Sequence, residues 1–136
     1  MAEQIAHTIF EVLNADRARP LLSGETTATT GDLAAMSTGY AAALREHGCG
    51  QGDRVVLCLQ SNTDMLAGIL GCWMIGVAPL PLDFRTPGSQ RAAIAGVAGA
   101  RLSVETRRPP DADGYRSAVP DEGWWRTAPG GIGVRA

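Results

Sequence analysis

Residues 54–83 form the stretch that most constrains the fold: they read RVVLCLQSNTDMLAGILGCWMIGVAPLPLD. Val55–Leu59 is an apolar run without polar alternation, which predicts a strand covered on both faces. Ser61 is a good N-cap for the helical pattern that follows it. The second apolar run, residues 78–82, alternates leucine with proline, and proline cannot donate to a ladder, so this strand is predicted to be short or at an edge. Together these features predict a βαβ unit of a parallel sheet.

The helix of this unit carries its large apolar residues at helical spacing. Gly68, Gly71 and Gly76 weaken it intrinsically, so tertiary packing is expected to hold it. The stripe is predicted to face the core, with Trp73 buried among its members; these are Leu66, Ile69, Leu70, Trp73 and Val77.

The flanking segments extend the unit into a small α/β domain. Residues 1–104 are predicted to form one domain, and the proline-rich and charged residues 105–136 an irregular tail with Trp124 and Trp125 as candidate anchors. The fold class expected is a partial three-layer α/β domain, in which helices flank a small, mainly parallel sheet. Its further elements are an amphipathic helix bearing Ile5, Ile9 and Val12 or Leu13, a hairpin within residues 19–30, a helix from the N-cap Thr29 to about His47, a helix from Thr86-Pro87 to Gly99 that carries Arg91, Ile94 and Val97, and a strand over residues 101–104.

Composition excludes several classes of function. The chain has 136 residues, a net charge of −2 and 45% hydrophobic residues, which are ordinary values for one globular domain and give no electrostatic case for nucleic acid. Its three cysteines, Cys49, Cys58 and Cys72, lack CxxC spacing and histidine companions, so reduced thiols are expected rather than a zinc site. No signal peptide or membrane span is recognisable, and a cytoplasmic protein is expected.

Two glycine-rich motifs have simpler explanations than phosphate binding. Residues 131–136 fit GxGxxG/A, but no helix follows to receive a pyrophosphate, so a chance match is favoured. Residues 48–53, GCGQGD, precede a strand instead of opening a helix, and a C-cap turn is favoured.

The isolated polar residues are likewise interpreted as structural. Asp53 is expected in a turn, Asp64 in the first turn of a helix and Asp83 at a strand end. His7 and His47 lie on predicted helices without a companion nucleophile or metal set. The sequence therefore predicts no catalytic, cofactor-binding or metal-binding residue.

Three segments together resemble the N-terminal region of adenylate-forming enzymes, namely acyl-CoA synthetases, aryl acid ligases and nonribosomal peptide adenylation domains. Residues 29–57 resemble the family's helix, glycine turn and "GDRV" strand, and residues 61–83 its "N…A.LG…AG…P.LPLD" motif. Residues 86–104 resemble the helix and strand that follow. The three segments occur in the family's order and cover more than half of the chain.

The resemblance implies ATP chemistry, but the residues that perform it are not matched here. Such enzymes hold the ATP phosphates with a Ser/Thr/Gly-rich loop ending in lysine, and a second lysine stabilises the adenylation step. All twelve basic residues of this chain are arginines, and residues 127–136 do not reproduce the loop. Arginine is a poor substitute for a compact ammonium group.

Two functions are therefore expected to compete. The first is a non-catalytic accessory or interaction module derived from an adenylating enzyme in a biosynthetic pathway, binding a partner enzyme or a small carboxylic or amino acid. The second is one subunit of a split ATP-dependent ligase, whose partner supplies the phosphate loop and the lysines and thereby ATP and Mg²⁺. A new activity on the same fold has no supporting residue set. A homodimer is expected to cover the apolar faces of the isolated fragment.

Overall fold

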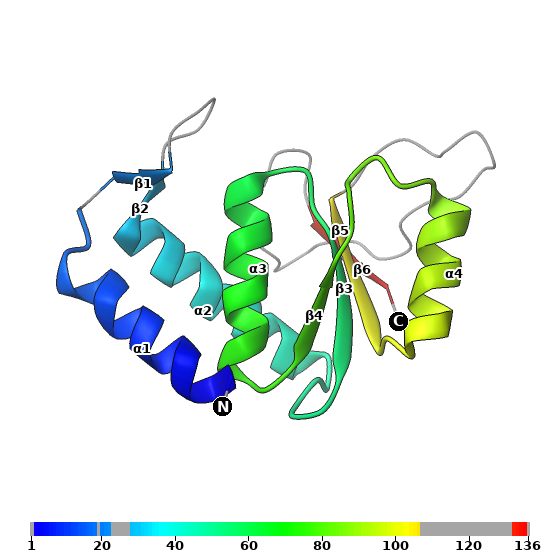
Figure 1. Ribbon diagram of the computed structural model, residues 1–136, viewed down its shortest axis with the longest axis horizontal. Coiled ribbons are helices and arrows are strands. Elements are labelled where there is room, and N and C mark those ends of the chain that lie inside the picture. Colours follow the sequence, from blue (N-terminus) through cyan, green and yellow to red (C-terminus); the bar gives the residue numbers. More distant parts are fainter. Residues whose placement is uncertain (1, 19, 23–27, 107–131, 136) are drawn as a thin grey trace.

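A four-stranded sheet with helices on both faces organises the structure, a computed structural model that describes residues 2–18, 20–22, 28–106 and 132–135 (Figure 1). The described elements are, in chain order, α1 (Ala2–Ala15), β1 (Pro20–Leu22), β2 (Ala28–Thr29), α2 (Thr30–Glu46), β3 (Arg54–Cys58), α3 (Asn62–Met74), β4 (Ala78–Pro81), α4 (Gly88–Ala98), β5 (Leu102–Thr106) and β6 (Ile132–Arg135).

The order of the strands in this sheet is β4-β3-β5-β6. β3 is central and pairs in parallel with both neighbours, so that Val56 lies beside Leu80 on one side and beside Ser103 on the other. β6 closes the far side in antiparallel pairing with β5. The βαβ unit predicted from residues 54–83 is confirmed, and so is the mainly parallel α/β sheet.

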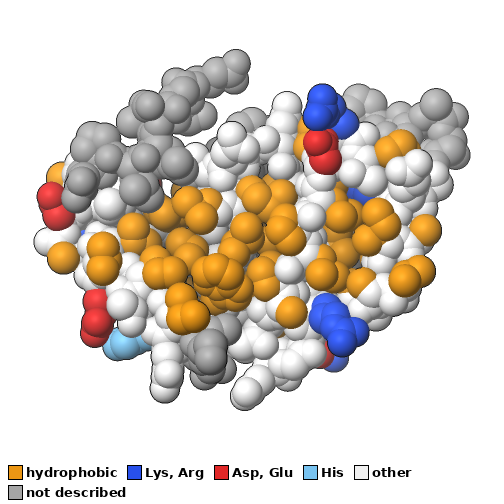
Figure 2. Space-filling model, viewed as in Figure 1, with side chains coloured by type: hydrophobic (Ala, Val, Ile, Leu, Met, Phe, Trp, Pro, Cys, Tyr) orange, Lys and Arg blue, Asp and Glu red, His pale blue; other side chains and the backbone are white. Residues whose placement is uncertain are grey.

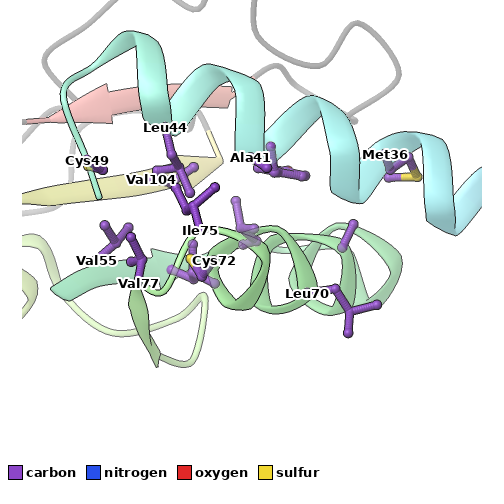
Figure 3. Close-up of a cluster of buried hydrophobic side chains, with 14 of the residues drawn as sticks. Met36, Ala41, Leu44, Cys49, Val55, Leu70, Cys72, Ile75, Val77 and Val104 are labelled. Carbon is purple, nitrogen blue, oxygen red and sulfur yellow. The ribbon is translucent and has the colours of Figure 1, made fainter. Parts of the chain in front are cut away.

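The helices divide between the two faces: α1, α2 and α3 lie on one side of the sheet and α4 on the other (Figure 1). Because side chains alternate across a strand, the residues of β3 divide in the same way. Val55, Leu57 and Leu59 belong to the main hydrophobic core, which also includes Val104 of β5. Figure 3 shows part of this core between α2, α3 and the sheet.

The packing of α3 differs from the predicted stripe. Leu70 is buried, but Leu66, Ile69 and Trp73 are only half-buried at the edge of the core. The prediction that Trp73 lies in the core is therefore wrong. The residues of α3 that pack inward are mostly small, and they are Ala67, Gly68, Gly71 and Cys72.

Close contact between α2 and α3 explains this choice. A Cβ at Gly71 would lie 2.8 Å from the carbonyl oxygen of Ser37 and 2.8 Å from Cβ of Tyr40, while one at Gly68 would lie 3.2 Å from Cδ1 of Leu57. The small residues let the backbone of α3 approach both α2 and the sheet. The large side chains of Leu66, Ile69 and Trp73 are half-buried and pack against the edge of the core. Figure 2 shows hydrophobic atoms forming a band across this view of the molecule.

The free edge of the sheet is formed by β4, as its prolines predict. The amides of Ala78 and Leu82 donate to the carbonyl oxygens of Asp53 and Leu57, at 2.9 and 2.8 Å. The alternate residues, Pro79 and Pro81, therefore face outward and have no N–H to donate. This edge is consequently protected against the addition of a further strand.

The N-terminal elements largely follow the sequence. β1 and β2 pair antiparallel, which confirms the hairpin. Thr29 caps α2, forming a capping box with Asp32. Of the two alternatives on α1, Leu13 is buried and Val12 is 68% exposed.

The C-terminal elements add two findings to the sequence predictions. Of the three residues expected along α4, Arg91 is buried, whereas Ile94 and Val97 are exposed. Residues 132–135, expected in an irregular tail, form β6, because pairing with the edge of β5 specifies this short strand and its own pattern does not. Trp124 and Trp125 lie outside the described residues. Within the described part of the chain, no helix has the length and apolar character to cross a membrane.

Candidate functional site at the carboxyl edge of the sheet

The carboxyl ends of β3, β4 and β5 meet at one edge of the sheet, shown at the top of Figure 1. The chain leaves β3 for β4 on one side and later enters β5 on the other. Open α/β sheets bind ligands outside the carboxyl ends of their strands, where the strand order reverses in this way. The gap between the ends of β3 and β5 is therefore the position at which this fold would place a site.

Backbone and hydroxyl groups join the two strands across that position. The amide of Gln60 donates to Oγ1 of Thr106, at 3.0 Å. Ser61 accepts from the amide of Asp64, at 3.3 Å, and so caps α3 as predicted. The Gln60–Thr106 bond holds the segment before α3 against the end of β5, and the Ser61 cap fixes the start of the helix.

An exposed ion pair follows β4. Asp83 accepts from the amide of Arg85 at 2.8 Å and from its guanidinium at 3.1 and 3.0 Å. These hydrogen bonds lower the pKa of Asp83 to about 2. The thiol of Cys58, at the end of β3, donates to the carbonyl oxygen of Asp83, at 3.4 Å. Asp83 lies at a strand end, as predicted, but the sequence did not predict its ion pair with Arg85.

A buried ion pair connects α4 with β5. The guanidinium of Arg91 donates to Oε1 of Glu105 and to the carbonyl oxygen of Thr86, and both charged residues are 2% exposed. The second oxygen of Glu105, Oε2, is buried without a hydrogen-bond partner. Sequence reasoning missed this pair. The available signal was Glu105, which directly follows the strand predicted over residues 101–104. A carboxylate that is buried at such a position requires a partner with opposite charge.

A second buried carboxylate lies in the first turn of α3. Asp64 is 3% exposed and accepts from the hydroxyl of Tyr40 of α2, at 3.0 Å. Burial raises the pKa of Asp64, against the opposing effect of its hydrogen bonds with Tyr40 and Ser61. Burial also raises the pKa of the Tyr40 phenol. Asp64 is in the first turn as predicted, and its bond with Tyr40 gives it a further structural role in fixing α3 to α2.

The remaining polar candidates lie elsewhere. Asp53 precedes β3 at the opposite edge of the sheet and accepts from the amide of Gly50, at 2.8 Å, in a turn. His7 is exposed and lies 3.1 Å from Glu11 on α1. His47 is the exposed C-cap of α2. Asp53 is therefore not brought together with Asp83. In the described part of the chain, no three His, Cys, Asp or Glu side chains gather in a way that could hold a metal ion.

Comparison with known proteins identifies the family. Residues 10–123 match the family described as AMP-binding enzyme. The chain belongs to this family. The resemblance of residues 29–104 to adenylate-forming enzymes is thereby confirmed.

The chain is similar to several curated members of the family. It is 34% identical over 107 residues to malpibaldin synthetase of Mortierella alpina, and this match covers 76% of the chain and 2% of the synthetase. It is 34% identical over 65 residues to 3-hydroxybenzoate–CoA ligase of Aromatoleum sp. (strain CIB), covering 48% of the chain and 12% of the ligase. The matched part thus spans only a small share of either relative.

Solved structures show the same fold. A benzoate CoA ligase from Burkholderia xenovorans LB400 is similar with a TM-score of 0.63 and 20% identity, over 71% of this chain and 20% of the ligase. The N-terminal subdomain of NpsA from Klebsiella oxytoca, in complex with anthranilyl-AMSN, is similar with a TM-score of 0.60 and 23% identity, over 69% of this chain and 25% of that one. The structural likeness confirms the α/β fold class.

Proposed function

We propose that these 136 residues form a non-catalytic accessory or interaction module derived from an acyl- or aminoacyl-adenylating enzyme, acting in the cytoplasm in a biosynthetic pathway such as that of a secondary metabolite. The observation that carries the proposal is that the carboxylates at the carboxyl edge are already paired with other residues of the chain. Arg91 holds Glu105, Arg85 holds Asp83 and Tyr40 holds Asp64. Glu105 and Asp64 are thus engaged in joining elements of the fold, and Asp83 is engaged in a local, exposed pair.

The outer surface of α3 supports a binding role. Between Asn62 and Leu82 the only charged residue is Asp64, which is buried. A helix exposed to water normally carries charge on its outer face. The half-buried Leu66, Ile69 and Trp73 are instead suited to contact with another polypeptide.

We propose a homodimer as the first partner of this face, with a partner enzyme or a small carboxylic or amino acid as the other ligands of the module. Pro79 and Pro81 have no backbone N–H to donate to a second copy of β4, so the dimer is not expected to form by strand pairing. Contact is expected through side chains instead. Light scattering over a concentration series should give a mass near twice 14.2 kDa.

Charged substitutions on the outer face test this dimer. Leu66→Glu and Ile69→Glu place a charge at half-buried positions of α3, and each should convert the dimer to monomer. Leu70 would be a poor probe, because it is 3% exposed and a charge there would unfold the chain. Gln90→Glu is the control, since it adds the same charge at an exposed position of α4. A soluble monomer at every concentration would contradict the dimer.

A split ATP-dependent ligase is the second candidate, and the family match favours it specifically. The matched fold makes up only 20% of the benzoate CoA ligase and 25% of the NpsA subdomain, so the remainder of an adenylating unit is available to a separate polypeptide. In that case the partner provides the phosphate loop, both lysines, and the sites for ATP and Mg²⁺.

Pyrophosphate exchange distinguishes the two candidates. The purified chain, tested with ATP and a panel of carboxylic and amino acids, is expected to give no exchange above background. The assay is then repeated with a 3-hydroxybenzoate–CoA ligase from which the region equivalent to this chain has been deleted. Restored exchange would favour the split ligase, whereas binding to an intact ligase without restoration favours the accessory role. Exchange by the isolated chain would refute both.

A further inference from the structure

The two faces of the sheet are held to their helices by different kinds of interaction. The face toward α2 and α3 is apolar, with Leu57, Val104 and the small residues of α3 in close contact. The face toward α4 carries Val56 and Cys58 of β3 and, on β5, Ser103 and Glu105. Half of these four buried side chains are polar.

α4 contributes little apolar surface to this second face. Of its eleven residues, all of which the structure describes, only Gly88 and Arg91 are buried. Ile94 is 39% exposed and Val97 is 93% exposed. None of these eleven residues belongs to the main hydrophobic core or packs against it, in contrast to α3.

Polar contacts attach the helix at both ends instead. Near its amino end, Arg91 donates to Glu105 and to the carbonyl oxygen of Thr86. At its carboxyl end, Nη1 of Arg54 donates to the carbonyl oxygen of Ala98, at 2.9 Å. The chain then turns at Gly99, whose φ of 67° is left-handed, and is fixed to β3 by the bond from the amide of Arg101 to the carbonyl oxygen of Arg54.

Such attachments hold a helix less firmly than apolar burial does. The desolvation of a buried ion pair cancels much of its Coulombic attraction, and the unpartnered Oε2 of Glu105 adds a further cost. Segments with few buried apolar contacts open at lower free energy than the rest of a protein. The opening of α4 therefore does not require the core around α3 to unfold.

We propose that α4 is a lid that opens as a unit while α1–α3 and the sheet remain folded. The Arg91–Glu105 pair is its latch, and the segments at 82–87 and at Gly99 are its hinges. Opening uncovers Glu105 and Cys58 at the carboxyl edge, where the strand order reverses. The lid would thus control access to the position at which this fold class binds ligands.

Hydrogen exchange on the native chain tests the proposal directly. Amides of α4 that are bonded within the helix should exchange at least about tenfold faster than those of α3, in the absence of denaturant. Equal protection of the two helices, or slower exchange in α4, would overturn the lid.

Two buried cysteines give a second and independent measurement. Cys58 lies on the face under α4, whereas Cys72 lies in the core of the opposite face. In a Cys49→Ala background, labelling of each thiol by a maleimide is followed by peptide mass spectrometry. Cys58 should be modified at least about tenfold faster than Cys72. Equal rates would show that both thiols become accessible only on global unfolding.

Variants of the latch separate local opening from general destabilisation. Arg91→Met removes a contact made only in the closed state and should accelerate labelling of Cys58 at least about tenfold further. Arg91→Met with Glu105→Leu removes both charges and should slow Cys58 again, because no charge is left buried alone. Leu70→Ala, on the opposite face, is the control: it weakens a core that the open lid retains, so it should accelerate labelling of Cys72 and leave that of Cys58 unchanged. If Arg91→Met did not accelerate labelling of Cys58, or if Leu70→Ala accelerated Cys58 as much as Cys72, the latch would be refuted.

Discussion

The strongest test of the packing is to place a methyl group at Gly71. Its Cβ would lie 2.8 Å from the Ser37 carbonyl oxygen, 2.8 Å from Cβ of Tyr40 and 3.1 Å from the backbone nitrogen of Ala41. None of these atoms is the end of a flexible side chain, so α2 and α3 must separate. Overpacking of this kind costs up to about 3 kcal/mol. Alanine restores about 1 kcal/mol through its helix propensity, leaving a net loss of about 2 kcal/mol.

Two other helical glycines provide matched controls. At Gly96 of α4, a Cβ would meet no other atom within 4 Å, so Gly96→Ala should stabilise the protein by about 0.5–1 kcal/mol. A Cβ at Gly68 would lie 3.2 Å from the end of the Leu57 side chain, which can move. The change in unfolding free energy for Gly68→Ala should therefore lie between those of the other two variants. The free energy of unfolding is measured for all three by urea denaturation. If Gly71→Ala were as stable as Gly96→Ala, close packing of α2 on α3 would be refuted.

Three further predictions follow from particular side chains. Burial raises the pKa of Asp64, so the folded protein holds the Asp64 proton more tightly than the unfolded chain does. Relative to Asp64→Asn, the wild type should therefore lose stability as the pH rises from below about 4 through the raised pKa. A difference in unfolding free energy that does not change with pH, measured by urea denaturation, would contradict this. Arg85→Ala should raise the pKa of Asp83 from about 2 toward 3.8, as measured by NMR titration of the carboxyl group; an unchanged pKa would exclude the pair in solution. Trp73→Ala should cost about 1–3 kcal/mol in urea denaturation, less than Leu70→Ala, because Trp73 is only half-buried; a loss equal to or above that of Leu70→Ala would place the ring in the core.

Much of the fold is determined by local sequence. The apolar run at Val55–Leu59 is typical of a strand covered on both faces, and the prolines of residues 78–82 limit the second strand to an edge. Thr29 and Ser61 have the side chains that helix N-termini require, and both are caps in the structure. These features depend on the backbone of a few neighbouring residues, which is why the sequence alone predicts them.

The side chains of α3 that face the core were decided by tertiary structure. Periodicity identifies a stripe, but it does not reveal how closely the neighbouring backbone approaches. Because α2 lies against Gly71, the small residues of α3 face inward, and Trp73 is left half-buried at the edge of the core.

The polar network at the carboxyl edge could not be predicted for a related reason. Arg91 and Glu105 lie on different elements, and Tyr40 and Asp64 are 24 residues apart. Local pattern identifies each as a helix or strand residue. The packing of α2 against α3 brings Tyr40 to Asp64, and the packing of α4 against β5 brings Arg91 to Glu105. The sequence by itself thus determined the elements and the family of this protein, whereas the tertiary structure decided which charges are buried, because the cost of burying a charge depends on a partner that the chain supplies from a distance.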